Sequence, residues 1–122
     1  MALAYHEPKE QLPPLVVDQH RAIESLIEEL EAIAWYNQRV AVTPDAQLRD
    51  ILAHNRDEEI EHASMVLEWL RRNFPGFDEK LRTYLFTSKP IARIEEKADP
   101  AGGEDASPSP AATLGIGSMK GA

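Results

Sequence analysis

The sequence predicts an all-α fold in which two long helices form an antiparallel hairpin and a short third helix follows. Apolar residues recur at intervals of three and four through two long segments, the pattern of helices with one buried face. Proline stands at the beginning of each segment, where it suits the first turn of a helix. The connection between the segments is short, so the helices should pack antiparallel. With 122 residues the chain has room for one domain and cannot enclose a large core by itself.

The first long helix is expected from Pro13 to about Val40, after a flexible N-terminal segment over residues 1–12. Proline at positions 13 and 14 fits the first turn, because its missing N–H group costs no hydrogen bond there. One apolar stripe predicts the face that this helix buries. Its residues are Ile23, Leu26, Ile27, Leu30, Ile33 and Ala34.

The second long helix is expected from Pro44 to about Asn73, with Thr43 as its N-cap residue and Pro44 at the first helical position. Three polar residues lie in the middle of its apolar stripe, where a polar side chain needs a partner. The whole stripe is Leu48, Ile51, Leu52, Asn55, Glu59, His62, Val66 and Trp69.

A short third helix is expected after the Pro-Gly pair at positions 75 and 76, which ends the second helix. It should run from Asp78 to Phe86, with an apolar edge for packing. That edge consists of Leu81, Tyr84 and Leu85. The helical domain as a whole is therefore expected over residues 13–96.

The composition favours cations as ligands. The net charge of -8 and a pI near 4.9 argue against nucleic acid and anionic membranes as partners. There is no cysteine, so oxygen and nitrogen must hold any metal, which favours Fe, Mn, Mg or Ca, and histidine shifts the choice toward iron or another transition metal. No apolar run approaches the roughly 20 residues that span a bilayer, and no signal sequence is recognisable, so a cytoplasmic protein is expected.

The chemistry is expected where the apolar stripe is interrupted. Glu59 and His62 form a Glu-x-x-His pair, whose side chains lie about 60° apart around a helix and can converge on one ion. Glu29 flanks the stripe of the first helix, and antiparallel packing puts it opposite this pair. One chain thus offers two carboxylates and one imidazole.

The single copy of this pair predicts a dimer. Four-helix proteins that bind two irons use about four carboxylates and two histidines, and they carry the Glu-x-x-His pair twice. Two copies of this hairpin around a two-fold axis would supply that set in a four-helix bundle. Tyr36, one turn beyond Ile33, is expected to hydrogen-bond a ligand or to lie close to the metal.

Other interpretations of these residues stay open. On spacing alone, Glu-x-x-His on a helix is most often a solvated face or a salt-bridged pair. Glu58, four residues before His62, is a rival ligand, whereas His20 and His54 are expected to be surface or packing histidines. A second acidic group on the first helix is either an ordinary solvated face or a weak site that collects Fe²⁺ or Ca²⁺. This group is Glu24, Glu28 and Glu31.

Four stretches together resemble the encapsulated ferritins. They are EELEAIAWY over residues 28–36, ILAHNRDEEIEH over residues 51–62, LEWLRRN over residues 67–73 and RTYLF over residues 82–86. The resemblance covers roughly residues 6–91. It implies a two-helix ferritin-like protomer with a short third helix, which dimerises and assembles into an open ring of dimers, commonly a decamer.

The resemblance also implies roles for individual residues. Glu29, Glu59 and His62 would be the ligands of a di-iron centre shared across the dimer interface, and Tyr36 would contact that centre. An outer metal site would collect cations, with calcium at this site or at assembly sites as a further expectation. Its residues would be Glu28, Glu31 and Trp35.

The C-terminal part of the chain carries a second resemblance. Residues 97–113 are rich in Ala, Pro, Gly, Ser, Asp and Glu and lack apolar periodicity, which predicts a flexible linker. Residues 114–122 are similar to the cargo-loading peptides that dock on the inner wall of encapsulin shells. Leu114 and Ile116 would enter pockets of the shell protein. The alternative is a disordered tail without a partner.

Together these features predict a ferroxidase that oxidises Fe(II) with O₂ and delivers Fe(III) for storage inside an encapsulin nanocompartment. Carboxylates suit this reaction because they bind both oxidation states of iron, while histidine anchors each ion. Two alternatives belong to other classes. One is a non-catalytic helical adaptor, and the other is a manganese or peroxide-handling di-metal oxidase on the same scaffold.

Overall fold

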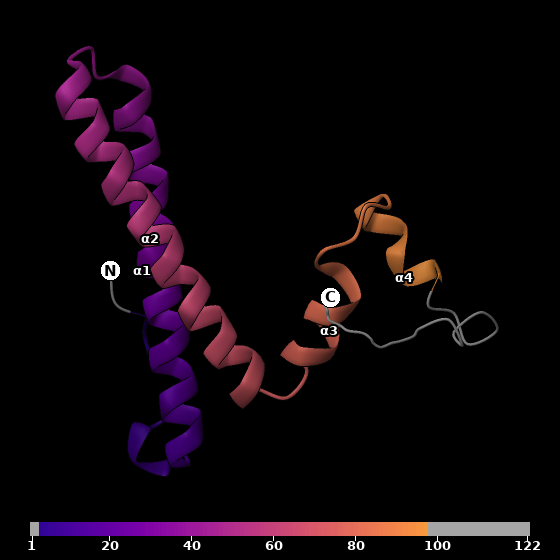
Figure 1. Cartoon of the computed structure of the whole chain (residues 1–122). Coiled ribbons are helices and arrows are strands. Elements are labelled where there is room, and N and C mark those ends of the chain that lie inside the picture. The colour runs from indigo at the N-terminus through magenta and orange to yellow at the C-terminus, as the bar shows by residue number, and fades with distance from the viewer. Residues whose placement is uncertain (1–2, 98–122) are drawn as a thin grey trace. The chain divides into compact units, whose positions relative to one another are not determined.

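The structure, a computed structural model, describes residues 3–97, and all regular structure within them is helical (Figure 1). The chain divides after Asp78 into two compact units. Most of the predicted linker and the terminal segment with Leu114 and Ile116 lie outside the described residues. The elements are η1 Lys9–Gln11, α1 Pro14–Val42, α2 Ala46–Asn73, α3 Phe77–Tyr84, η2 Ile91–Arg93 and α4 Ile94–Lys97, where η marks a 3₁₀ turn.

The predicted hairpin and short third helix are confirmed. Helices α1 and α2 lie side by side and run antiparallel, and the first residues of α1 extend beyond the end of α2 (Figure 1). Pro13 precedes α1 in an extended conformation and Pro14 occupies its first turn, as proline geometry favours. The end of α1, at Val42, falls two residues beyond the predicted one. No helix within residues 3–97 is long and apolar enough to cross a membrane.

The predicted start of α2 is wrong by two residues. Asp45, rather than Thr43, is the N-cap residue, and its carboxylate accepts a hydrogen bond from the Leu48 amide at 2.8 Å. Thr43 is engaged elsewhere, because its hydroxyl donates to the carbonyl oxygen of Arg39 and so closes the end of α1. An aspartate also carries a negative charge to the positive end of the helix dipole. Pro44 therefore belongs to the turn and not to the helix.

The third helix ends two residues earlier than predicted, at Tyr84. Phe86 adopts a left-handed conformation with φ of 59°, which L-residues adopt only at isolated positions and which a continuing helix cannot contain. After Pro90 the chain forms η2 and α4, two short elements that the sequence interpretation did not identify. Segments of three and four residues are too short to show helical periodicity.

The N-terminal residues, expected to be flexible, make defined contacts with α1. The carbonyl oxygen of Leu3 lies 2.8 Å from His20 Nε2, which must donate because a carbonyl can only accept. The Leu3 amide donates to Glu24 at 3.2 Å, and the Tyr5 ring stacks on His20 with centroids 4.0 Å apart. His20 is thus a packing residue, one of the two roles expected for it.

The apolar stripes are less buried than predicted. Leu30 and Ile51 remain 53% and 54% exposed, and the fully or nearly buried positions of the hairpin are Val17, Ala63 and Leu70. Two helices can cover each other along only one seam, so a stripe that is wider than the seam stays open to solvent. The prediction of a buried face is therefore wrong for the single protomer.

Candidate metal centre

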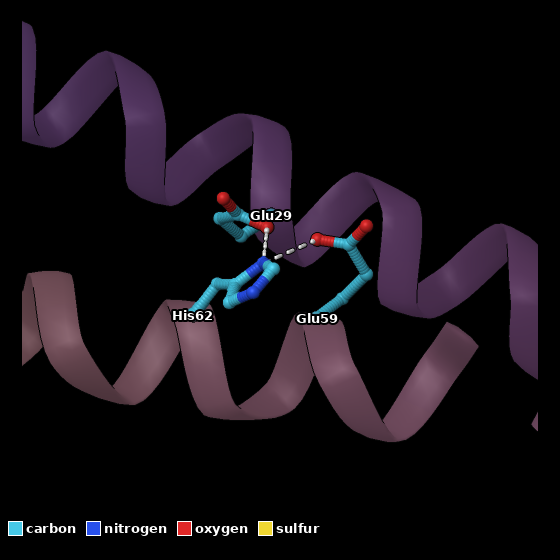
Figure 2. A group of neighbouring side chains, drawn as sticks. All are labelled: Glu29, Glu59 and His62. Carbon is cyan, nitrogen blue, oxygen red and sulfur yellow. Dashed lines mark ion pairs between the residues drawn. The ribbon is translucent and has the colours of Figure 1, made fainter. Parts of the chain in front are cut away.

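Three side chains from the two long helices converge near the middle of the hairpin (Figure 2). His62 Nδ1 lies 3.4 Å from a carboxylate oxygen of Glu59 and 3.7 Å from one of Glu29. One possible ligand atom from each of the three residues lies within 4.8 Å of the other two. The structure thus brings together the three residues that the sequence predicted as ligands.

Helix geometry explains this convergence. Glu59 and His62 are three residues apart on α2, so their side chains leave the helix on the same side, one turn apart. Glu29 comes from α1, and the antiparallel hairpin sets the middle of α1 against this part of α2 (Figure 2). The group needs both helices and the register between them.

The centre is partly open to solvent. The side chains of Glu29 and Glu59 are 24% and 26% exposed, whereas that of His62 is 47% exposed. The expectation that His62 lies on a buried face is therefore wrong within one chain. An open side is consistent with access by ions or by a second copy of the protein.

The group holds two carboxylates, those of Glu29 and Glu59, close enough for their charges to affect each other. The pKa of Glu29 is raised above its ordinary value, chiefly because its carboxyl shares a hydrogen bond with Glu59, then because of burial and of the neighbouring Glu59 charge. The charge of His62 lowers the pKa of Glu29, but this effect is smaller than those that raise it. Two carboxylates that share so small a space repel each other when both are ionised, and a bound cation relieves that repulsion.

Glu58, the rival ligand, faces the other nitrogen of His62. Its carboxylate lies 4.0 Å from His62 Nε2, on the far side of the ring from Glu29 and Glu59, and 3.9 Å from His54 Nε2. His62 therefore has carboxylates beside both ring nitrogens, with Glu29 and Glu59 closer to Nδ1 than Glu58 is to Nε2.

The remaining predicted site residues also lie on α1, and none of them belongs to the group of converging side chains. Tyr36 is partly buried, and the guanidinium of Arg39 lies 5.2 Å from the centre of its ring. The structure leaves the outer set on the exposed surface of α1. This outer set is Glu28, Glu31 and Trp35. Sequence reasoning passed over Asn37 and Arg56, which join the two helices close to the centre, although Arg56 precedes Glu59 by only one helical turn.

The donor set fits a transition metal. Atoms bound to one such ion at about 2.1 Å lie at most about 4.2 Å apart. Both distances from His62 Nδ1 to the carboxylate oxygens are below this limit. Two carboxylates and an imidazole suit iron, manganese or zinc, and three donors leave about half the positions of a six-coordinate ion for further ligands.

A helical hairpin that brings two carboxylates and one imidazole together from facing helices is half of the bundle arrangement of ferritin-like proteins. The family model described as EncFtn-like matches residues 4–88, about two thirds of the chain. The chain belongs to the EncFtn-like family, and the resemblance seen in its sequence is confirmed.

Individual relatives agree with this assignment. The chain is 63% identical over 97 residues to a ferritin-like protein of Thermotoga maritima, with 80% of this chain and 85% of the relative covered. It is 57% identical over 123 residues to an encapsulated ferritin-like protein of Rhodospirillum rubrum, with 95% and 87% covered. The crystal structure of protein ne0167 from Nitrosomonas europaea is similar with a TM-score of 0.69 and 60% identity, covering 72% of this chain and 97% of that one.

Proposed function

We propose that this protein is a ferroxidase whose substrates, Fe(II) and O₂, react at a di-iron centre formed by two copies of the chain. The observation that carries the proposal is the convergence of Glu29, Glu59 and His62, with ligand atoms within 4.8 Å of one another. Membership of the EncFtn-like family supports it, because ferritin-like proteins handle iron.

The donors suit a reaction in which iron changes its charge. Glu29 and Glu59 can bind Fe(II) and Fe(III) through the same oxygens, and His62 Nδ1 anchors the ion at the open side. Each Fe(II) gives up one electron. Two Fe(II) therefore reduce O₂ to hydrogen peroxide with the uptake of two protons, and four Fe(II) reduce it to two waters with the uptake of four. Tyr36, near the cluster in sequence, is assigned to contact the centre.

Two copies of the chain complete the centre in this proposal. One hairpin contributes two carboxylates and one imidazole, half of the set that a di-iron bundle uses. The exposed parts of the apolar stripes, such as Leu30 and Ile51, would be covered in the same step by the facing hairpin of a four-helix bundle. A ring of such dimers, as in a decamer, is the assembly that we assign.

An outer acidic surface would feed the centre. Glu28 and Glu31 are neighbours on the exposed side of α1, and Trp35 follows them one turn later. In an acidic protein such a surface raises the local concentration of divalent cations, of which Fe²⁺ is the substrate and Ca²⁺ a competitor or an assembly ion. These three residues are assigned to cation collection.

The oxidised iron would be stored inside an encapsulin shell. The Rhodospirillum rubrum relative is named an encapsulated ferritin-like protein, and 95% of this chain aligns with it. An open ring has no closed interior of its own, so a mineral needs a separate container. We assign the linker over residues 97–113 and the segment 114–122, through Leu114 and Ile116, to attachment on the shell, in the cytoplasm.

The activity is tested with variants of the three ligands and one matched carboxylate. Glu29→Ala, Glu59→Ala and His62→Ala should each lower the rate of Fe(II) oxidation by at least about tenfold, whereas Glu61→Ala, an exposed neighbour, should leave it unchanged. Fe(III) is followed by its ultraviolet absorbance and O₂ with an electrode. Equal rates in all four variants would sink the proposal, and faster turnover with manganese or peroxide would replace it with another di-metal oxidase.

A further inference from the structure

Besides the hydrogen bond between Glu29 and Glu59 in the candidate centre itself, two hydrogen bonds within residues 3–97 tie α1 to α2, and the centre lies between these two. Gln19 Nε2 donates to the backbone carbonyl of Asn73 at 2.7 Å, and Arg56 Nη1 donates to the side-chain oxygen of Asn37 at 3.1 Å. Along α1, Glu29 follows Gln19 by ten residues and precedes Asn37 by eight. The hydrogen bond between Asn37 and Arg56 is the nearer of the two to the candidate centre, because Arg56 precedes Glu59 by one helical turn.

The register of the two helices decides whether a centre exists at all. A helix rises about 1.5 Å per residue, so a slip of one residue moves Glu29 by about 1.5 Å relative to His62. Metal coordination tolerates only about 0.2 Å. Apolar packing is not directional and the apolar seam of this hairpin is narrow, whereas a hydrogen bond fixes both a distance and a direction. Polar ties are therefore the features of the hairpin best suited to fix the register.

The geometry of the two ties restricts rotation as well as sliding. At about 100° per residue, Gln19 and Asn37 both lie roughly 80° to the same side of Glu29 around α1, about five turns apart. The ties thus hold one flank of the seam between the helices, on either side of the centre. Rolling α1 about its own axis away from that flank would lengthen both of them.

Arg56 is itself held in place. Its Nε donates to the carboxylate of Asp57 at 3.1 Å, and only 27% of its side chain is exposed. The planar guanidinium directs its donors in fixed directions, so an anchor at Nε aims Nη1 at Asn37. The result is a preset contact between the helices.

We propose that Asn37 and Arg56 are positioning residues for the metal centre, and that their hydrogen bond sets the register in which Glu29 faces Glu59 and His62. The inference rests on the proposed function in one respect only, namely that these three residues bind a metal. Neither Asn37 nor Arg56 is a ligand, and their effect reaches the metal through the helices.

The test is a Co(II) titration of the whole protein, followed by the visible absorption of the bound ion, at a temperature where circular dichroism shows every variant to be folded. Asn37→Ala and Arg56→Ala should each weaken Co(II) binding by about tenfold or more, the usual size of the effect of an outer partner. The double variant should bind no more weakly than the single ones, because both remove the same contact. Asn37→Asp keeps an acceptor for Arg56 and should restore most of the affinity.

A matched control separates positioning from general stability. The guanidinium of Arg49 also donates a hydrogen bond to a residue outside its own helix, the carbonyl oxygen of Thr43 at 3.1 Å, but Arg49 lies in the first turn of α2, beside the turn of the hairpin. Arg49→Ala should lower the melting temperature without changing Co(II) affinity. Affinities for Asn37→Ala equal to wild type, or losses in Arg49→Ala as large as those in Asn37→Ala, would overturn the inference. Failure of the wild type to bind Co(II) would instead contradict the proposed function.

Discussion

Helix α2 carries two charged clusters that look alike in the sequence and differ in kind. Near its end, the Glu68 carboxylate accepts hydrogen bonds from Arg71 at 2.8 and 2.9 Å and from Arg72 at 2.6 Å, and Arg71 also donates to Asp78. In its middle, Glu59 and His62 meet Glu29 of α1. The first cluster matches every carboxylate with a guanidinium, whereas the second gathers two carboxylates around one imidazole.

The pKa shifts of the two clusters have opposite signs. Hydrogen bonds from Arg71 and Arg72 lower the pKa of Glu68 to about 2, and the same network raises the pKa of Arg71. In the centre, the pKa of Glu29 is raised, first by the hydrogen bond with Glu59. A cluster in which every carboxylate is paired with a guanidinium needs no further ion, whereas a bound cation would relieve the repulsion between two neighbouring carboxylates. The two clusters thus differ in the sign of the pKa shift.

The largest expected effect is on iron binding. Glu59→Ala should weaken Fe(II) binding by at least about tenfold, because it removes a donor, while Glu68→Ala should leave binding unchanged. Anaerobic titration calorimetry on both variants measures the contrast. Equal losses in the two variants would mean that the two clusters do not differ in metal binding.

The next effect concerns stability. Glu68→Gln should lower the free energy of unfolding of the metal-free protein by about 1–2 kcal/mol near pH 7, a modest figure because the side chain is partly exposed. A carboxyl whose folded pKa is depressed stabilises the protein above its unfolded pKa, here about 4.5, and this contribution is lost as the pH falls toward about 2. Denaturant unfolding at several pH values should therefore show the wild type and the variant converging between about pH 4.5 and 2. A constant difference over this window would contradict the assignment.

The smallest expected effect is a gain in the stability of the metal-free protein. Glu29→Gln should raise the melting temperature of the metal-free protein by about 2–4 °C, because it removes a charge that the folded state holds against Glu59. A raised pKa means that the folded state binds more protons than the unfolded one above the unfolded pKa, so wild-type stability falls as the pH rises through that range. The gain should accordingly be smaller at pH 4 than at pH 7. Glu10→Gln, an exposed control, should change nothing, and a lower melting temperature for Glu29→Gln would contradict the account.

Sequence patterns predicted the hairpin and the convergence of Glu29, Glu59 and His62 because both follow from helical periodicity. A residue spacing fixes which side chains share a face, and a short turn fixes the antiparallel direction. The choice of Asp45 over Thr43 as N-cap could not be predicted in this way, since it depends on the Thr43 hydroxyl being used by Arg39 at the end of α1.

The sequence patterns also could not predict the exposure of side chains or the contacts between the two helices. The side chain of His62 is half exposed because two helices cover each other only along a narrow seam. The periodicity of the sequence does not indicate how wide that seam is. The contact between Asn37 and Arg56 joins residues 19 positions apart, which no local pattern relates. The sequence therefore predicted the three residues that converge, but not the residues that we propose to hold them in register.

The central claim is that one chain holds half of a metal centre. Native mass spectrometry of the protein with and without added Fe(II) tests it most directly, because it reports the number of chains and the number of irons in the same particle. We expect about one iron per chain, bound only in assemblies with an even number of chains, and loss of that iron in Glu29→Ala. A monomer that retains iron as tightly as the assemblies would contradict the account.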